Sequence, residues 1–147
     1  MSNPVVRFSV VGTPVQQGSK RHVGNGRMIE AANGHREWRH AVATEAAAVA
    51  ARRTDTPLDG PLCLSVAFSF PMPASRPKRL LRIGRAWKTT APDLDKLIRS
   101  VGDALTVSGL IRDDARIGMV MASKVETTDA AGADIAVWPL DALGGDR

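Results

Sequence analysis

Cysteine is nearly absent from this chain. Cys63 is the single cysteine of the 147 residues, so no disulfide can form within the chain. The three histidines show no spacing that would join them or Cys63 into a zinc site. We interpret the histidines as surface residues or neighbours of phosphate, and Cys63, with its apolar neighbours, as a small buried core residue.

Long apolar runs are missing as well. No stretch of about 18 apolar residues suggests a membrane span. Arg7 interrupts the N-terminal segment in which a signal peptide would carry its hydrophobic region. The glycines around Lys20 do not have the P-loop spacing, which argues against nucleotide hydrolysis. We therefore expect a cytoplasmic protein without a nucleotide cofactor.

Strand and helix patterns alternate along the chain. Strands are expected at 5–12, 27–30, 62–70, 116–126 and 133–139, and helices at 33–53 and 95–108. Asn33 is the expected cap of the first helix, 71–92 is expected to be a long loop, and 127–132 should close a hairpin. Taken with the two helices, the four longer strands give the order β-α-β-α-β-β, which predicts an α+β fold. We expect residues 1–147 to form a single small domain, a mixed β-sheet covered by two helices, with a loose tail over 140–147.

Charge is distributed unevenly between the two parts of the chain. Residues 1–92 carry fourteen Lys and Arg against five Asp and Glu, and residues 93–147 carry six against ten. The run 76–88 has six cations and no acid, and the repulsion between these like charges favours an anionic partner. An acidic group inside a basic protein predicts chemistry on a polyanion, of which nucleic acid is the commonest.

The acidic group consists of two pairs of carboxylates. Asp93 and Asp95 follow Pro92 and precede the helix expected at 95–108, and Asp113 and Asp114 follow that helix. Crowded carboxylates repel one another unless a cation lies between them, and hard divalent cations such as Mg²⁺ prefer oxygen ligands. A structural alternative is that Asp95 caps the helix and that the second pair forms a turn.

Several basic side chains are candidates for binding the phosphate groups of DNA or for stabilising the scissile phosphate. Arg99 lies four residues after Asp95 and four before Asp103, a spacing that suits ion pairs or stabilisation of charge on a scissile phosphate. The expected chemistry is metal-assisted phosphodiester hydrolysis. The candidate DNA-binding residues are Lys20, Arg21, Arg27, Arg76, Lys78, Arg79, Arg82, Arg85, Lys88, Lys96 and Lys124. Trp87 could stack on an unpaired base or could anchor its loop.

Two segments of the chain resemble a known family. Residues 93–105 read DLDKLIRSVGDAL, and residues 109–114 read GLIRDD. Members of the RusA family of Holliday junction resolvases carry D-L-D-N-L-x-K-x-x-x-D-A-L, then a glycine, a hydrophobic pair and D-D. The G-x-P loop at 12–14 and the basic residues after it are similar to the phage-borne branch. The resemblance covers most of residues 5–126.

The resemblance implies roles for individual residues. Asp93, Asp95 and Asp114 would be the metal-binding catalytic carboxylates, with Asp113 as a less essential neighbour in the same metal site. The catalytic lysine of the family falls at Arg99, which keeps the positive charge but not the compact ammonium group. The asparagine after D-L-D falls at Lys96, a second departure.

The resemblance also implies an activity and a partner. It implies an endodeoxyribonuclease that depends on Mg²⁺, with Mn²⁺ as a substitute, and that acts as a homodimer. Such an enzyme makes paired nicks across a four-way DNA junction. It would act in the cytoplasm of a bacterial cell, away from any membrane, and a phage or prophage could encode it. Two alternatives stay open: a non-catalytic DNA-binding protein that keeps the fold, and a nuclease that also cuts flaps or forks.

Overall fold

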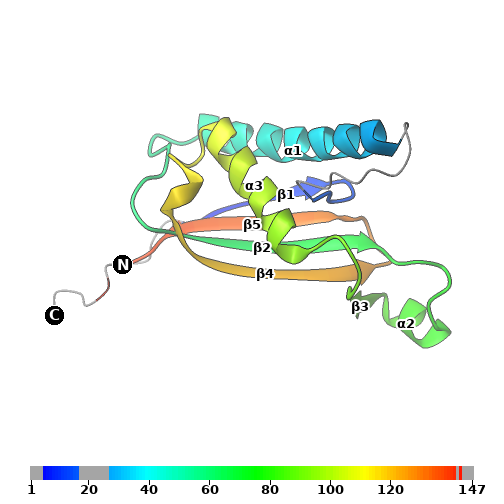
Figure 1. The fold of residues 1–147 in the computed structure, drawn as a ribbon. Coiled ribbons are helices and arrows are strands. Elements are labelled where there is room, and N and C mark those ends of the chain that lie inside the picture. Colours follow the sequence, from blue (N-terminus) through cyan, green and yellow to red (C-terminus); the bar gives the residue numbers. More distant parts are fainter. Residues whose placement is uncertain (1–4, 17–26, 142, 144–147) are drawn as a thin grey trace.

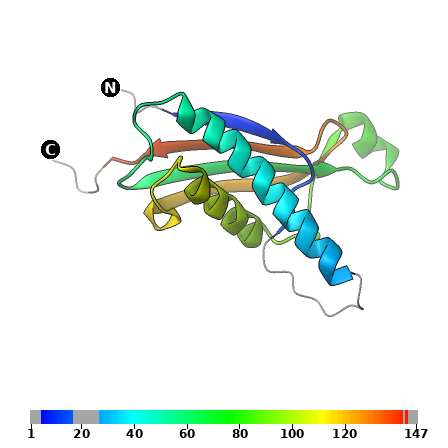
Figure 2. The same ribbon diagram turned by 90° about the horizontal axis from the view of Figure 1, so that it is seen from above.

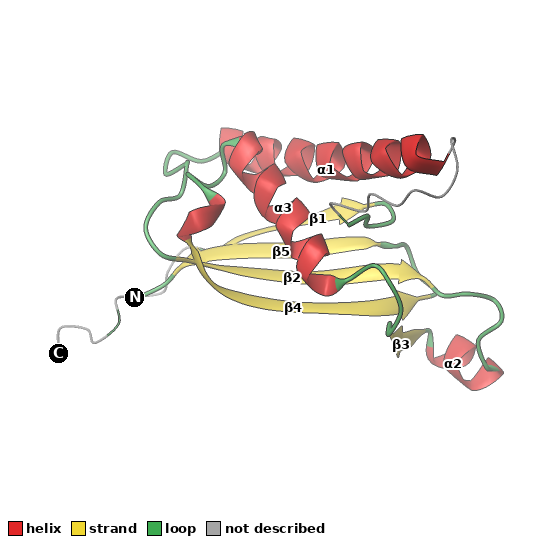
Figure 3. Cartoon of the chain, viewed as in Figure 1, coloured by secondary structure: helices red, strands yellow, loops and turns green. Residues whose placement is uncertain are grey.

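The computed structural model describes residues 5–16, 27–141 and 143, with the backbone alone for 27–33. Its elements follow the chain in the order β1 (Val6–Val11), α1 (Arg27–Ala51), β2 (Leu62–Pro71), α2 (Lys78–Ile83), β3 (Arg85–Trp87), α3 (Leu94–Ser108), the 3-10 helix η1 (Asp114–Arg116), β4 (Ile117–Thr127) and β5 (Gly132–Pro139). Strands and helices are distinguished by colour in Figure 3.

The strands form one mixed sheet in the order β1-β5-β2-β4-β3. The central strand β2 runs antiparallel to β5 and parallel to β4. Both long helices, α1 and α3, lie over the same face of the sheet, and no helix of the described residues lies over the opposite face (Figures 1 and 2). The predicted α+β fold, a mixed sheet covered by two helices, is confirmed.

The core lies between the sheet and these two helices. Side chains that alternate along β2, among them Leu64 and Phe68, are fully buried. They belong to the same buried cluster as Val42 of α1 and Leu97 and Val101 of α3. Since burial of one such side chain contributes about 1.5–3 kcal/mol, α3 is held firmly against the sheet.

The start of α1 differs from the sequence-based expectation. The strand predicted at 27–30 is wrong, because these residues form the first turn of α1, and Asn33 is therefore not a cap. The helix ends at Ala51, before the two arginines that were expected to end it. One face of the helix packs into the core, since Trp38, Val42 and Ala46 are buried.

The second half of the chain differs in three places. The loop expected at 71–92 contains α2 and β3. The hairpin predicted at 127–132 is wrong, because β2 lies between β4 and β5. A bulge shifts the register so that Leu62 pairs with Ile117 and Cys63 with Met119, so Ile117 faces the core while Met119 faces away from it. At the predicted tail, the backbone N–H of Leu140 donates to Pro61 O at 2.8 Å.

Candidate active site

Asp93 and Asp95 lie at the start of α3 with exposed carboxylates. Asp93 occupies the N-cap position in an extended conformation, but its side chain makes no capping hydrogen bond. Asp95 lies inside the first helical turn, so the alternative in which it caps the helix is not what the structure shows. The only ion pair that involves either carboxylate, among the residues that are described, joins Asp93 to Lys96 at 3.7 Å. Both carboxylates are therefore available to a ligand at the positive end of the helix.

Lys124 of β4 binds the backbone of the segment that precedes Asp93. Its ammonium donates to the carbonyl oxygens of Thr90 at 2.8 Å and of Pro92 at 2.7 Å. The backbone N–H of Asp93 donates to Oε1 of Gln16 at 2.7 Å. Lys124 was predicted to contact DNA, but its position makes it a support for the acidic segment. The sequence gives no signal for these contacts, since they join residues 32 and 77 positions apart.

Asp113 and Asp114 form the second pair, at η1. Asp113 caps η1 by accepting a hydrogen bond from the N–H of Ala115 at 3.0 Å. This bond, together with a hydrogen bond from Asp114, lowers the pKa of Asp113. The hydrogen bond with Asp113, partial burial and the nearby charges of Asp113 and Asp103 raise the pKa of Asp114. The two carboxyls thus favour a shared proton, which a divalent cation could replace.

Gly102 of α3 is where the second pair meets the helix. A Cβ atom at Gly102 would lie 3.4 Å from Cβ of Asp114, so glycine allows η1 to approach closely. Gly102 is seven residues after Asp95, or about 10 Å along a helix, on nearly the same side of α3. Asp114 therefore approaches α3 about two turns beyond Asp95. In the parts of the chain that are described, no three His, Cys, Asp or Glu side chains come close enough to hold a metal.

Arg99 lies on α3 one turn after Asp95 and one turn before Gly102, which Asp114 approaches. Its side chain is exposed. Within the described ranges, no ion pair joins it to Asp95 or Asp103, so the surface pairs that its spacing allowed are not formed. The guanidinium remains available to an anion beside either pair.

The basic run from Arg76 to Lys88 forms an arm that projects from the end of the sheet (Figures 1 and 2). Arg76 makes a two-pronged ion pair with Glu126, with N–O distances of 2.7 and 2.6 Å. Because only 2% of the Glu126 side chain is exposed, we interpret Arg76 as an anchor of the arm instead of the predicted DNA contact. Lys88 lies over the ring of Phe70, with Nζ 4.9 Å from the ring centre.

The outer part of the arm is open to solvent. The exposed cations are Lys78, Arg79, Arg82 and Arg85. Helix α2 buries no residue, and the side chains of Ile83 and Trp87 are 65% and 74% exposed. Trp87 is therefore not a core residue. A projecting, cationic element with exposed apolar side chains suits a nucleic-acid surface.

The other predicted residues are placed less fully. Lys20 and Arg21 lie outside the described residues, and Arg27 is the first residue of α1, with no described side chain. Lys96 is half-buried beside Asp93. His35 is not a free surface residue, because its Nε2 lies 3.1 Å from Oγ of buried Ser100 and so links α1 to α3. Cys63 is buried, as predicted.

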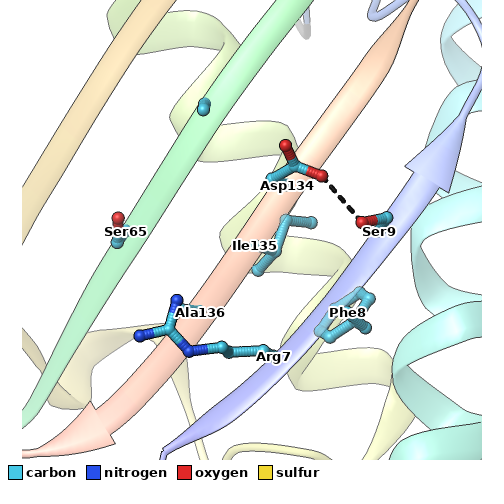
Figure 4. A pocket seen from close by; sticks show the side chains of 8 residues that line it. Arg7, Phe8, Ser9, Ser65, Asp134, Ile135 and Ala136 are labelled. Carbon is cyan, nitrogen blue, oxygen red and sulfur yellow. Dashed lines mark hydrogen bonds between the residues drawn. The ribbon is translucent and has the colours of Figure 1, made fainter. Parts of the chain in front are cut away.

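A shallow hollow lies on the face of the sheet that carries no helix (Figure 4). Arg7, Ser9, Ser65 and Asp134 contribute to its lining, and Oγ of Ser9 donates to Asp134 at 2.7 Å. None of the predicted catalytic residues lines it. The hollow therefore lies apart from the acidic pairs, which are on α3 and η1.

Comparisons with known proteins agree with the motif. The family model for endodeoxyribonuclease RusA matches residues 11–137. The match covers both acidic pairs and the basic arm, and it confirms the resemblance drawn from residues 93–114. No curated protein matches the sequence. No helix in the described residues is long and apolar enough to cross a membrane.

Proposed function

Because the chain belongs to the RusA family of endodeoxyribonucleases, we propose that it is a magnesium-dependent nuclease that resolves four-way DNA junctions. The observation that carries this proposal is the pair of exposed carboxylates, Asp93 and Asp95, at the start of α3. Neither is used as a helix cap, and the segment before them is fastened by Lys124. The carboxylate oxygens of Asp93 and Asp95 are thus positioned by the backbone while they stay available to a metal ion.

The donor set suits a hard divalent cation. Asp93 and Asp95 would hold Mg²⁺ from one end of the site, and Asp114, with Asp113 beside it, would contribute carboxylate oxygens from the other. When bound, such an ion supplies an activated water and neutralises charge on the phosphate. The raised pKa of Asp114, caused first by its carboxyl neighbour Asp113, supports this assignment, because crowded carboxylates favour a positive ligand between them.

The remaining side chains act on the DNA itself. Arg99, one turn after Asp95, would orient the scissile phosphate and stabilise the negative charge that develops on it. Lys96 would contact a neighbouring phosphate. The exposed cations of the arm would bind the backbone of a junction strand and set the direction in which DNA leaves the site.

Paired cleavage requires two active sites. A four-way junction has two-fold symmetry, and a symmetric homodimer presents two equivalent sites to it. We therefore propose that the protein acts as a homodimer that cuts two opposing strands.

Cleavage assays with labelled DNA test this function. Four-way junction, duplex and flap substrates are incubated with Mg²⁺, with Mn²⁺ or with EDTA. We expect paired nicks on the junction only, in the presence of either metal. Cleavage of flaps at a similar rate would indicate a broader nuclease, and metal-independent binding without cleavage would indicate a DNA-binding protein.

The variant Asp95→Asn examines the metal ligand directly. It should abolish cleavage and leave junction binding intact or tighter, because a negative charge near phosphate is removed. Undiminished cleavage by Asp95→Asn, with unchanged metal dependence, would contradict the assignment.

A further inference from the structure

Two exposed arginines flank the second acidic pair. Arg112 immediately precedes Asp113, and Arg116 is the last residue of η1, two positions after Asp114. The side chains of Arg112 and Arg116 are 58% and 44% exposed. Both guanidinium groups therefore reach solvent beside carboxylates that are candidates for the metal site.

One carboxylate, that of Asp59, contacts both arginines. Nε of Arg116 donates to Oδ1 of Asp59 at 2.6 Å, and Nε of Arg112 lies 3.5 Å from Oδ2 of the same residue. The hydrogen bond from Arg116 is the main cause of the lowered pKa of Asp59, so this carboxyl stays ionised. A single negative charge thus faces two positive charges, and the cluster keeps an excess positive charge.

The turn that carries Asp59 is fastened to the segment that leads into the acidic pair. The N–H of Leu58 donates to the carbonyl of Leu110, and the N–H of Arg112 donates to the carbonyl of Leu58, both at 2.8 Å. The side chains of Leu58 and Leu110 are buried. Because the backbone fixes Asp59 beside Arg112, the arginines are gathered before any ligand arrives, which lowers the entropy cost of binding one.

The contacts with Asp59 leave the outer ends of both guanidinium groups open. Each contact uses Nε, and among the described residues no hydrogen bond or ion pair uses a terminal nitrogen of Arg112 or Arg116. Terminal guanidinium nitrogens donate readily to the oxygens of a phosphate. Arg53 provides a contrast within the chain, because its Nε and Nη2 both donate to Asp55 at 2.8 Å.

We propose that Arg112 and Arg116, gathered by Asp59, form a clamp that binds phosphates of the DNA backbone beside the second acidic pair. This inference rests on the proposed function, because it names a second surface for the same DNA. DNA is the favoured ligand because a metal ion on the neighbouring carboxylates would also attract phosphate.

The place of the clamp in the fold suits a long polyanion. Helix η1 immediately precedes β4, whereas the basic arm joins the other end of this strand of 11 residues through β3. Figure 3 shows η1 and the arm at opposite ends of the sheet. The clamp and the arm therefore lie on the two sides of the acidic pairs, where they would hold the DNA backbone on both sides of the scissile phosphate.

The double variant Arg112→Gln with Arg116→Gln tests the clamp. Affinity for labelled four-way junction and for duplex DNA is measured in EDTA over a range of salt concentrations, with circular dichroism to verify folding. Loss of two phosphate contacts should reduce the slope of log affinity against log salt concentration by about two units or slightly less. The ratio of parental to variant affinity should then shrink about twelvefold between about 50 and 200 mM salt. If the double variant does not fold, Arg112→Gln alone should reduce the slope by about one unit.

Two further variants distinguish a phosphate clamp from general effects of charge or folding. Asp59→Asn keeps an oxygen that can accept from Arg116 and removes a negative charge near phosphate. Its slope should be parental, and its affinity should be equal or higher. The matched control is Arg52→Gln with Arg53→Gln, which also removes two positive charges, just after α1, where Arg53 pairs with Asp55. This control should keep the parental slope.

A parental slope for the variant that lacks both Arg112 and Arg116 would overturn the clamp. An equal loss of slope in Asp59→Asn or in the control would overturn it as well, because the effect would then come from folding or from net charge. Junction cleavage in Mg²⁺ is assayed separately. A parent that cuts junctions, together with an unchanged slope for the double variant, would refute the clamp alone. A parent that cuts no DNA, together with the expected loss of slope, would refute the proposed function alone.

Discussion

Lys124 provides the sharpest test of how the acidic segment is positioned. Lys124→Met keeps the aliphatic part of the side chain and removes two hydrogen bonds, to the carbonyls of Thr90 and Pro92. A hydrogen bond to a charged group contributes about 1.5–3 kcal/mol, and the lower value applies because the side chain is only half-buried. Two such bonds amount to about 3 kcal/mol, and since each 1.4 kcal/mol is a factor of ten, the equilibrium constant for correct placement of the segment falls about a hundredfold.

The expected result is a cleavage rate about a hundredfold lower at saturating junction, since small misplacements of reacting groups have effects of this size. Junction affinity should change little. The measurement is single-turnover cleavage of a labelled four-way junction, together with a binding titration in Ca²⁺ or EDTA.

Lys78→Met is the matched control, because Lys78 is an exposed lysine of α2. It removes the same charge and should weaken binding without slowing cleavage at saturation. If Lys124→Met behaves like this control, Lys124 is a phosphate contact, and the positioning role is refuted. Cleavage at the parental rate with parental affinity would refute both roles.

Three further predictions concern the arm and the face of α3. In the same single-turnover assay, Arg99→Ala should slow cleavage severely, whereas Arg99→Lys should keep much of the activity. If Arg99→Ala cleaves at the parental rate, Arg99 is a surface residue without a catalytic role. Replacing Arg79, Arg82 and Arg85 together by neutral residues should flatten the plot of log affinity against log salt concentration. The slope should fall by about one unit or slightly less for each phosphate contact that is lost, and an unchanged slope would mean that the arm faces away from DNA. Arg76 lowers the pKa of Glu126 below its ordinary value of 4.5, so this pair stabilises the fold above that pH, and its contribution disappears as the pH falls through the lower folded value. In urea unfolding at a series of pH values, Glu126→Gln should be less stable than the parent at neutral pH and should lose less stability below pH 4.5; parallel pH profiles would contradict the assignment.

Local pattern was sufficient for the elements that bury a regular face. The strand at 62–70 and the helix at 95–108 were predicted correctly because the apolar residues of each segment repeat with the period of its structure. The short run at 27–30 was misread as a strand, although it continues into a segment rich in alanine and other good helix formers. Helix α2 and strand β3 could not be predicted, because they are held by Arg76 with Glu126 and by pairing with β4, which are contacts between distant residues.

The candidate site was predictable in its residues but not in its geometry. The motif identified both acidic pairs, since spacing along the chain is visible in the sequence. Their separation depends on η1 lying against Gly102, and the support from Lys124 depends on β4 lying beside β2. The assumption that neighbouring strands 116–126 and 133–139 pair with each other failed because β2 is inserted between them. Neither tertiary arrangement leaves a periodic signal.

The pairing of β1 has a consequence for how the chain is synthesised. Among the described strands, β1 pairs with β5 alone, with Val6 opposite Val137. During translation, β1 therefore cannot pair within the sheet until β5 has left the ribosome. Contacts between such distant residues form slowly compared with local structure. Until β5 emerges, the growing chain has β1 without a partner and one edge of β2 open, and it is in this interval that the nascent protein is most exposed to aggregation.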